Sequence, residues 1–583
     1  MVAGVGVGRS QSCWRCRSAN QPGDGFCQQC GASLVQRDNT TRYLCAAAQI
    51  SEKYANAAIR EFLVEPLRAI PPAPGVDTSA VLREAVASRT RRRIRDGVLL
   101  VLALVFLFVN PTALLFWLLA AVVVAMLPGR FRVSGPADLV FAVGVMAVAA
   151  FVLGLGLVDD LTSSRSSGSS SSLGYSDLSG ADASPVSGLV RVVVLTAVLS
   201  LLIFGVLLAD QLVVRFLVFQ RFRRGAFVVD GRTSPSEWER RLRGLGLEGF
   251  RLPLGRVAAA EESVPDHDAT ADVVVHREFS PFVGAGIPLH QKVITLPLDP
   301  SGEHTDPQGI SVVELQQHVG AAIDRLRTTS SLGPGRRLEN LTQREQVLVP
   351  ADRLVVDHAS VPEVLRDLDH PPAGRLPVEQ ARALADSAVE WARYYRCFRV
   401  ESWDRDLTTS CYLHVGTDQR MLYLEWQFLA LLPIAPEFRA IDRHRDSAAR
   451  LLADTFLEMW TLPATLFRRT ASVFRRFKPL RQDLNEVVPA KYGADRSLRE
   501  LAQADRVQSY FQDVDVERYV RIVDATLFRA VGEYLQDHGY SVVEFMKMAD
   551  PVVNNYDVSG STFVNSAVGS NSTVNNSKSA KGK

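Results

Sequence analysis

Four cysteines near the N-terminus have the spacing of a tetrahedral metal site. Cys13 and Cys16 form one CxxC pair, and Cys27 and Cys30 form a second after ten intervening residues. Each CxxC turn presents two thiolates to one metal ion, so two such turns complete a four-coordinate zinc site. Gly31 supplies the permissive backbone that such a turn favours. We predict a structural Zn²⁺ ion here, because four thiolates leave no open position for catalysis.

This cysteine pattern resembles the short zinc-ribbon family found at the N-termini of many bacterial membrane and signalling proteins. The resemblance covers residues 11–34 and implies that these four cysteines are the ligands. Arg17 departs from the family pattern, which usually has glycine there. The alternative interpretation is four unrelated surface cysteines. The module has few basic residues, which argues against nucleic acid as a partner, as does the chain's net charge of only +2.

Three apolar runs follow, over residues 97–127, 138–158 and 189–209. A run of about 18 or more apolar residues can cross the hydrocarbon core of a bilayer as a helix. The sequence therefore predicts an α-helical transmembrane region over residues 97–217. No ionisable residue lies near the middle of any run, which argues against ion-coupled transport.

Arginines flank these runs and indicate their orientation, because loops near membrane ends keep excess Lys and Arg in the cytoplasm. Since both flanks of residues 97–127 are basic, we expect the chain to enter and return there, with a turn at Asn110 and Pro111. This gives about four passes through the plasma membrane with both termini cytoplasmic. The alternative is one long helix kinked at Pro111. The flanking arginines are Arg89, Arg91, Arg92, Arg93, Arg95, Arg130, Arg132, Arg215, Arg221, Arg223 and Arg224.

Two of these flanks, Arg89 to Arg95 and Arg215 to Arg224, would also attract anionic lipid headgroups. Asp210 and Arg191 lie near the ends of the last run and are interpreted as anchors at the interface. Residues 159–188 are rich in Ser and Gly, cannot bury enough apolar surface to fold, and are expected to form an extracytoplasmic loop.

The remaining residues indicate juxtamembrane helices over 41–96 and a cytoplasmic α+β domain over 225–550. Alternating apolar residues predict a hairpin of strands at 408–415 and 421–431. Helical spacing predicts one helix over 41–66, with Asp77 or Thr78 capping the next. We also expect strands at 271–275, 293–298, 345–350, 354–356 and 397–400, and helices at 310–328, 377–395, 448–469, 497–503 and 516–536.

Motifs that would name an activity are missing from this domain. Gly284 and Gly286 lack the further glycines of a nucleotide-binding loop and are interpreted as a turn. Cys411 and His414 lie three apart on a predicted strand and so point to opposite faces. Residues 467–478 combine arginines with phenylalanines. We interpret them as an exposed helix face, with docking on the inner leaflet as the alternative.

Three segments, residues 43–49, 276–286 and 417–426, resemble an uncharacterised family of actinomycete membrane proteins. That resemblance supports the architecture and implies no site. Residues 551–583 form an Asn- and Ser-rich, low-complexity tail with low charge. The tail is either disordered or stacks as cross-β structure, and it resembles loosely the amyloid-type signalling motifs of bacterial effectors.

The sequence thus predicts a multidomain integral membrane protein, with the bilayer as its principal partner. We expect a non-enzymatic signalling, scaffold or effector role, with protein partners or self-association through the zinc ribbon or the tail. A transporter or channel component is the first alternative, and an enzyme in the cytoplasmic domain is the second.

Overall fold

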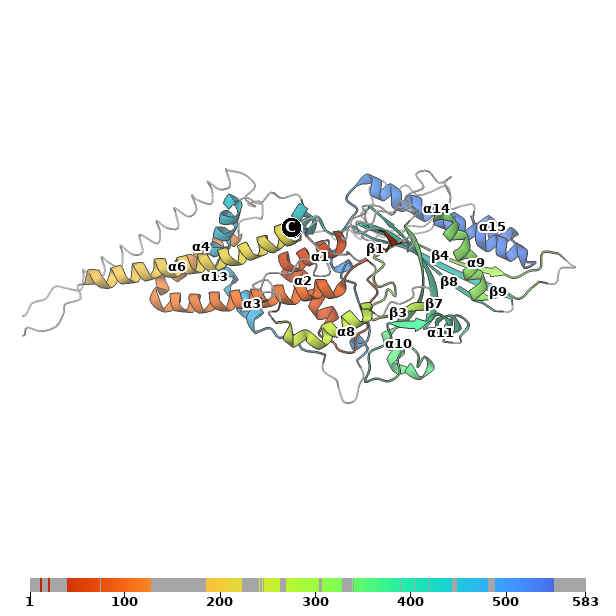
Figure 1. The fold of residues 1–583 in the computed structure, drawn as a ribbon, viewed down its shortest axis with the longest axis horizontal. Helices are drawn as coiled ribbons and strands as arrows, with labels where there is room; N and C mark the ends of the chain where they lie inside the picture. The colour runs from red at the N-terminus through yellow and green to blue at the C-terminus, as the bar shows by residue number, and fades with distance from the viewer. Residues whose placement is uncertain are drawn as a thin grey trace, which may run out of the picture.

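The computed structural model describes most of the chain between residues 39 and 549. Figure 1 shows an elongated body with long helices at one end and a seven-stranded sheet at the other. The described ranges are 11–12, 19–20, 39–73, 75–126, 185–222, 241, 244, 246–262, 269–302, 307–327, 338, 340–387, 389–403, 405–418, 420–442, 448–480 and 488–549. The predicted second apolar run, residues 138–158, and the tail from residue 551 lie outside them.

The helical end contains seven helices among the residues that the structure describes. They are α1 (Asn39–Ile50), α2 (Glu52–Phe62), α3 (Thr78–Val109), α4 (Pro111–Met126), α6 (Pro185–Phe216), α8 (Arg251–Glu262) and α13 (Ala448–Phe474). The prediction of one helix over 41–66 is wrong. Ser51 adopts an extended backbone there and its hydroxyl accepts a hydrogen bond from the Tyr54 N–H, which starts a new helix. Asp77 caps α3 as predicted, accepting from the Ala80 N–H.

The long helix α3 ends at Asn110, where the chain bends by 120° into α4. Pro111 occupies the first position of α4, and the Asn110 side chain accepts a hydrogen bond from the Ala113 N–H at 3.0 Å. Phe106 and Trp117 contact each other across the bend, with ring centroids 5.5 Å apart. The structure therefore has a sharp turn at the predicted position.

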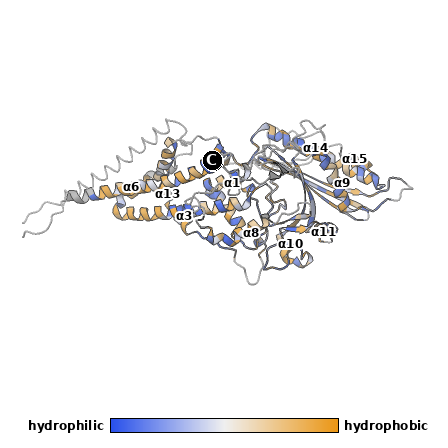
Figure 2. Ribbon diagram, viewed as in Figure 1, coloured by the Kyte–Doolittle hydropathy of each residue, from blue (hydrophilic) through white to orange (hydrophobic). Residues whose placement is uncertain are grey.

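Helix α6 is the longest apolar helix of the described chain. It begins at Pro185, so the last residues of the predicted 159–188 loop are helical. The segment Arg191–Arg221, which ends in the short π-helix η1 (Leu217–Arg221), is long and apolar enough to cross a membrane. The bent pair of α3 and α4 passes the same test only when counted as one span. The described residues thus hold one or two candidate spans, which Figure 2 shows as the most hydrophobic helices.

The sheet end is a mixed sheet of strand order β4-β9-β8-β7-β5-β3-β6, in which only β3 and β5 are parallel. The predicted hairpin is confirmed as β8 and β9. The strands are β3 (Thr270–His276), β4 (Ile287–Pro297), β5 (Leu341–Pro350), β6 (Arg375–Pro377), β7 (Arg393–Ser402), β8 (Leu407–Thr417) and β9 (Met421–Leu431).

Helices cover one face of this sheet, on which the side chains of Val347, Tyr394 and Trp426 all lie. Trp426 is buried on this face, beneath α9 (Val312–Asp324), α14 (Tyr510–Asp537) and α15 (Val543–Ala549). Other helices, α10 (Ala351–Val356) and α11 (Val378–Ala383), pack on the core around Val347 and Tyr394.

Two sequence predictions fail near this second core. Residues 354–356 belong to α10 rather than to a strand. The predicted helix 377–395 ends at Ala383, and the short turn Leu384–Asp386 follows it. Residues from Arg393 onwards join β7 because they pair with β5, so sheet pairing overrides helical spacing there.

The two ends of the molecule share one hydrophobic core. Leu44, Ile59 and Leu82 of α1, α2 and α3 are buried together with Ile434 and Leu498 from the sheet end. Across the same junction, Arg42 pairs with Asp442 at 2.7 Å and Arg277 pairs with Glu61 at 2.8 Å. The helices before the apolar runs are therefore packed against the sheet module.

Candidate functional site

The four predicted zinc ligands, Cys13, Cys16, Cys27 and Cys30, lie outside the described residues. Strand β1 (Gln11–Ser12) pairs with β2 (Ala19–Asn20), and these strands bracket the first cysteine pair in the sequence. Within the described ranges, no group of three or more His, Cys, Asp or Glu side chains could hold a metal ion. The zinc site remains a prediction from the sequence.

The structure brings together two arginine-rich segments that the sequence analysis treated separately. Arg89 and Arg93 of α3 donate hydrogen bonds to the carbonyl oxygen of Arg475, at 2.9 and 2.6 Å. Arg475 directly follows α13, 386 residues further along the chain than Arg89. Arginines beside the last carbonyls of a helix are favourable, because the helix C-terminus carries partial negative charge.

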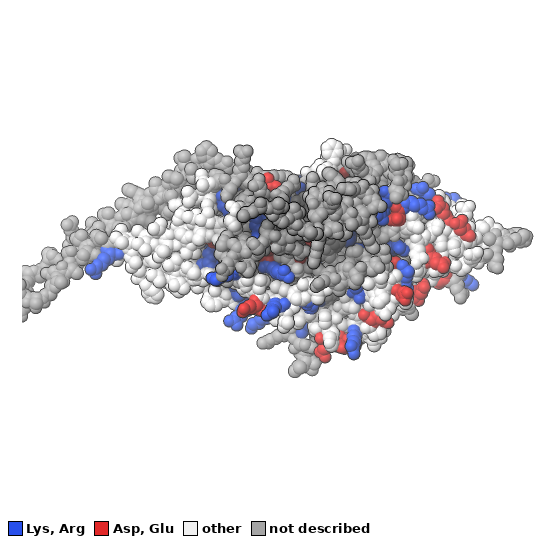
Figure 3. All heavy atoms as spheres, viewed as in Figure 1, with Lys and Arg blue, Asp and Glu red and all other residues white. Residues whose placement is uncertain are grey.

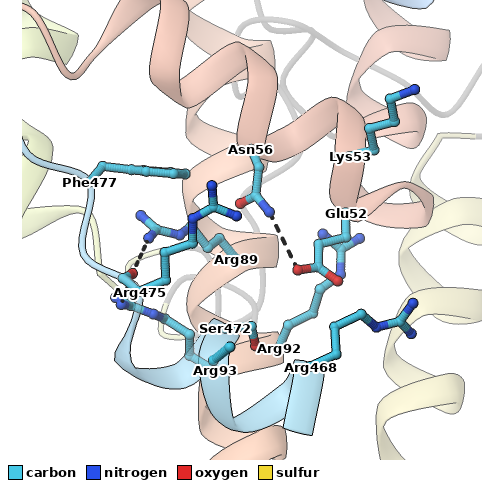
Figure 4. A pocket seen from close by; sticks show the side chains of 11 residues that line it. Glu52, Lys53, Asn56, Arg89, Arg92, Arg93, Arg468, Ser472, Arg475 and Phe477 are labelled. Carbon is cyan, nitrogen blue, oxygen red and sulfur yellow. Dashed lines mark hydrogen bonds between the residues drawn. The ribbon is translucent and has the colours of Figure 1, made fainter. Parts of the chain in front are cut away.

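These segments and the start of α2 enclose a pocket of about 420 Å³ (Figure 4). Its lining carries six basic side chains and one acidic side chain, a formal excess of five positive charges. The residues are Glu52, Lys53, Asn56, Arg89, Arg92, Arg93, Arg468, Ala471, Ser472, Arg475 and Phe477. We call this cavity the basic pocket.

Aromatic and backbone contacts hold two of these arginines in place. The Arg89 guanidinium lies over the Phe477 ring, 3.7 Å from its centroid, a geometry that favours a cation. Arg92 is buried and donates to the carbonyl oxygens of Ala48 and Gln49, near the end of α1. The Nε atom of Arg93 is buried without a hydrogen-bond partner. The pocket therefore has both fixed cations and an unused buried donor.

The one acidic group of the pocket offsets only part of the charge of its six cations. The Glu52 carboxylate accepts from the Asn56 amide at 3.4 Å, and Figure 4 shows the two together at one side of the cavity. Within the described chain, Lys53 and Arg468 make no ion pair with a carboxylate. Burial, followed by the charges of Arg93 and Arg475, lowers the pKa of Arg89 to about 10. Like charges are thus crowded here, before the apolar run that begins at Gly97.

Next to the basic pocket, a second cluster of charges is fully compensated. Asp210 of α6 accepts from Arg91 and from Arg95 of α3, the latter at 2.9 Å. Asp96 of α3 accepts from Arg469 of α13 at 2.8 Å. Arg469 also binds Glu458 at 2.9 Å. We call these six side chains the charge network.

The charge network joins α3, α6 and α13 with three basic and three acidic groups, all with little exposed surface. Two arginines of α3 bind Asp210, and its interpretation as an anchor at the interface stays a prediction. The arginines predicted to meet lipid headgroups have different environments in the structure. Arg91 and Arg95 belong to the charge network and Arg215 pairs with Asp454, whereas Arg89, Arg92 and Arg93 line the basic pocket. Arg223 and Arg224 lie outside the described residues.

Helix α13 crosses α3 and α6 (Figure 1) and packs on both as well as on α4. Leu462 at its centre is buried with Leu99, Phe106 and Ile203. The outward side of α13 is divided. At 100° per residue, Phe467 and Phe474 fall on one half, whereas Arg468 and Arg475 fall on the other. Phe467 is 88% exposed and Phe474 is 70% exposed.

Two other sequence interpretations are confirmed: the glycine turn, and the opposite orientation of Cys411 and His414. Gly284 and Gly286 both have φ of +91°, and their N–H groups donate to the buried Glu500 carboxylate at 3.0 and 2.9 Å. They form a structural turn. Cys411 is buried beneath α14, whereas His414 bonds to the Tyr394 carbonyl oxygen on the opposite side of β8.

Comparisons with known proteins reach only part of the chain. A family model described as an AbeC-like domain matches residues 291–571, slightly under half of the sequence. The match begins within β4 and includes α13, the helix that carries one wall of the basic pocket. No curated protein and no solved structure matches the chain. The family description names no substrate or reaction, so it assigns no role to a residue.

Proposed function

We propose that this chain is an integral membrane protein that holds its α+β module against the inner face of the plasma membrane. It acts in signalling or scaffolding rather than in catalysis. One observation carries the proposal: α13, which follows the sheet strands in the chain, is bound by buried ion pairs to Arg95 and Asp96 of α3 and packs against the apolar segments of α3 and α6. Movement or clustering of the membrane helices would therefore be transmitted directly to the module.

The exposed apolar surface of the helical end supports a lipid environment. Leu201 of α6 is 71% exposed, and Val194, Leu202 and Phe108 are also exposed. Figure 3 shows a largely uncharged surface over the outer parts of α3 and α6. Contiguous apolar surface of this kind marks a site of contact with membrane or protein. The length and hydropathy of Arg191–Arg221 favour the membrane.

The position of α13 supports placing the inner membrane surface at its level. A helix with an apolar half and a basic half lies along the interface, its apolar residues towards the acyl chains. Phe467 and Phe474 supply the apolar half and Arg468 supplies part of the basic half. Asp96 and Asp210, at the ends of the apolar segments, lie at this level because they belong to the charge network.

The charge network also supports an anchoring role over transport. Ion-coupled transporters use ionisable groups that change partners along a pathway. Here Asp96, Asp210 and Glu458 each bind at least one arginine. Balanced buried pairs fix helix positions, whereas a pathway would need an acid that is released during the cycle.

The zinc ribbon and the tail are proposed as the assembly elements of this scaffold. Four thiolates would give a rigid module for binding a protein partner. Low charge and alternating small and branched residues give the tail the composition of stacking segments. If the tail drives clustering, deletion of residues 556–583 should reduce the full chain to smaller oligomers by light scattering. An unchanged size would exclude that role.

Cysteine accessibility in intact cells tests the membrane arrangement. Single cysteines replace Ser170 and Ser331, and a membrane-impermeant maleimide is added from outside. We expect labelling at position 170 alone, because the proposal places residues 159–184 outside and the α+β module inside. Labelling at position 331 in intact cells, or release of the whole chain by alkaline carbonate, would overturn the proposal.

A further inference from the structure

The basic pocket has the composition of an anion site rather than of a structural charge cluster. The charge network beside it balances three buried arginines with three carboxylates. The basic pocket has a single carboxylate for six cations. An anion from outside the chain would supply the missing negative charge.

We propose that the basic pocket binds the phosphate group of a hydroxyl-bearing phosphate ester, such as a glycerol phosphate headgroup. Guanidinium groups offer planar pairs of N–H donors that match phosphate oxygens, and several arginines line the cavity. The unpaired Nε of Arg93 provides one such donor. The cavity volume of about 420 Å³ lies within the range of small-ligand pockets.

The side of the pocket that Glu52 and Asn56 line indicates which esters fit. Glu52 and Asn56 lie together at that side (Figure 4). Their carboxylate and amide groups can accept from and donate to hydroxyl groups, as glycerol provides. A bare carboxylate or sulfate ion would leave these two groups without a ligand contact. The arrangement therefore favours a phosphate that carries a polyol over a simple inorganic anion.

Two sources supply this chemistry, a lipid headgroup and a soluble phosphate ester. The lipid source rests on the proposed function, since it requires α13 to lie at the membrane surface. The exposed Phe467 and Phe474 project from the same helix as Arg468, and Arg475 directly follows that helix. Acyl chains of a lipid could then extend along the phenylalanines while its phosphate occupies the pocket.

The test uses the full chain in a neutral detergent, with binding measured by calorimetry. The probes are sn-glycerol 3-phosphate, inorganic phosphate and short-chain dihexanoyl phosphatidylglycerol. The variant is Lys53→Gln/Arg468→Gln, which removes two cations that make no ion pair among the described residues. The matched control is Arg83→Gln, an exposed arginine of α3 outside the pocket. A second variant, Arg93→Lys, keeps the charge and removes the guanidinium fork.

We expect wild type and Arg83→Gln to bind alike, and the double variant to bind at least tenfold more weakly. Arg93→Lys should lose affinity although its charge is unchanged. Binding of glycerol 3-phosphate and the lipid supports the shared phosphate site, and binding of the lipid alone identifies a headgroup site. Equal affinity of wild type and the double variant, or no binding of any probe, would overturn the proposal. Neither result would alter the labelling at position 170, so failure of the two proposals can be distinguished.

Discussion

Arg469 and Asp96 connect α13 to α3 by a hydrogen-bonded ion pair of 2.8 Å between side chains that are both almost fully buried. The residues are 373 positions apart in the sequence. Asp96 also precedes the apolar segment of α3 directly. This pair therefore fixes the depth at which α13 crosses the apolar helices.

Breaking this pair should destabilise the helical end. Arg469→Ala leaves the buried Asp96 carboxylate with Arg95 and Ser472 as remaining partners, so the loss should fall below the cost of about 3–5 kcal/mol for a buried charge left without any partner. Thermal unfolding of the full chain in detergent measures the effect. Arg327→Ala, which removes an exposed pair with Asp324, should cost about 0–1 kcal/mol. Similar losses for the two variants would show that the charge network contributes no more than a surface pair.

Gly286 is a position at which only glycine fits. Its φ is +91°, and an added Cβ would lie 2.2 Å from the Ala430 carbonyl oxygen. Gly286→Ala should lower the free energy of unfolding by about 2 kcal/mol or more, from backbone strain and from overpacking. Gly309→Ala is the control, because an added Cβ there meets no atom within 4 Å. Equal denaturation midpoints for the two variants would contradict the strained turn.

His414 should contribute to acid destabilisation. Burial lowers its pKa below the usual 6.5, so the unfolded chain takes up this proton at a higher pH than the folded chain. The contribution of neutral His414 to the free energy of unfolding is therefore fully present above about pH 6.5, and it is lost as the pH falls below that value. His414→Gln should reduce the slope of stability against pH between about 6.5 and 5. Burial also lowers the pKa values of His276 and His290. These two histidines contribute to the same pH dependence, so the substitution should reduce the slope only in part. An unchanged slope would show that His414 does not contribute to acid destabilisation.

Local patterns in the sequence predict several elements well. Asp77 was identified as a helix cap because its type and place suit the orphan N–H groups of α3. The hairpin of β8 and β9 follows from alternation, since one side of each strand is buried beneath α14. The turn at Asn110 follows from the proline that starts α4.

The candidate site could not be predicted in the same way. The basic pocket forms because Arg89 contacts the residue that follows α13, 386 positions away in the sequence. A local sequence pattern cannot predict a contact between residues so far apart. The charge network has the same origin, because Asp210 lies 119 and 115 positions from its partners Arg91 and Arg95. The one available signal was the pairing of basic residues with phenylalanines near Phe477, and it suggested an exposed face rather than a cavity wall.

The zinc prediction can be tested without the structure. Purified full chain should carry about one zinc ion, bound by four thiolates, by elemental mass spectrometry. Cys27→Ser should lower the zinc content, whereas Cys45→Ser should not, because Cys45 is a buried core residue of α1. Full zinc content in the Cys27→Ser protein would contradict the ligand assignment.

The central claim, that α13 lies at the membrane surface, is tested most directly by photo-crosslinking in lipid nanodiscs. Benzoylphenylalanine replaces Phe467 in the full chain, and in a second protein it replaces Phe279, a fully exposed phenylalanine between β3 and β4. Mass spectrometry after irradiation identifies lipid adducts. We expect adducts on phospholipid acyl chains at position 467 and none at position 279. Absence of lipid adducts at 467, or equal yields at both positions, would contradict this claim.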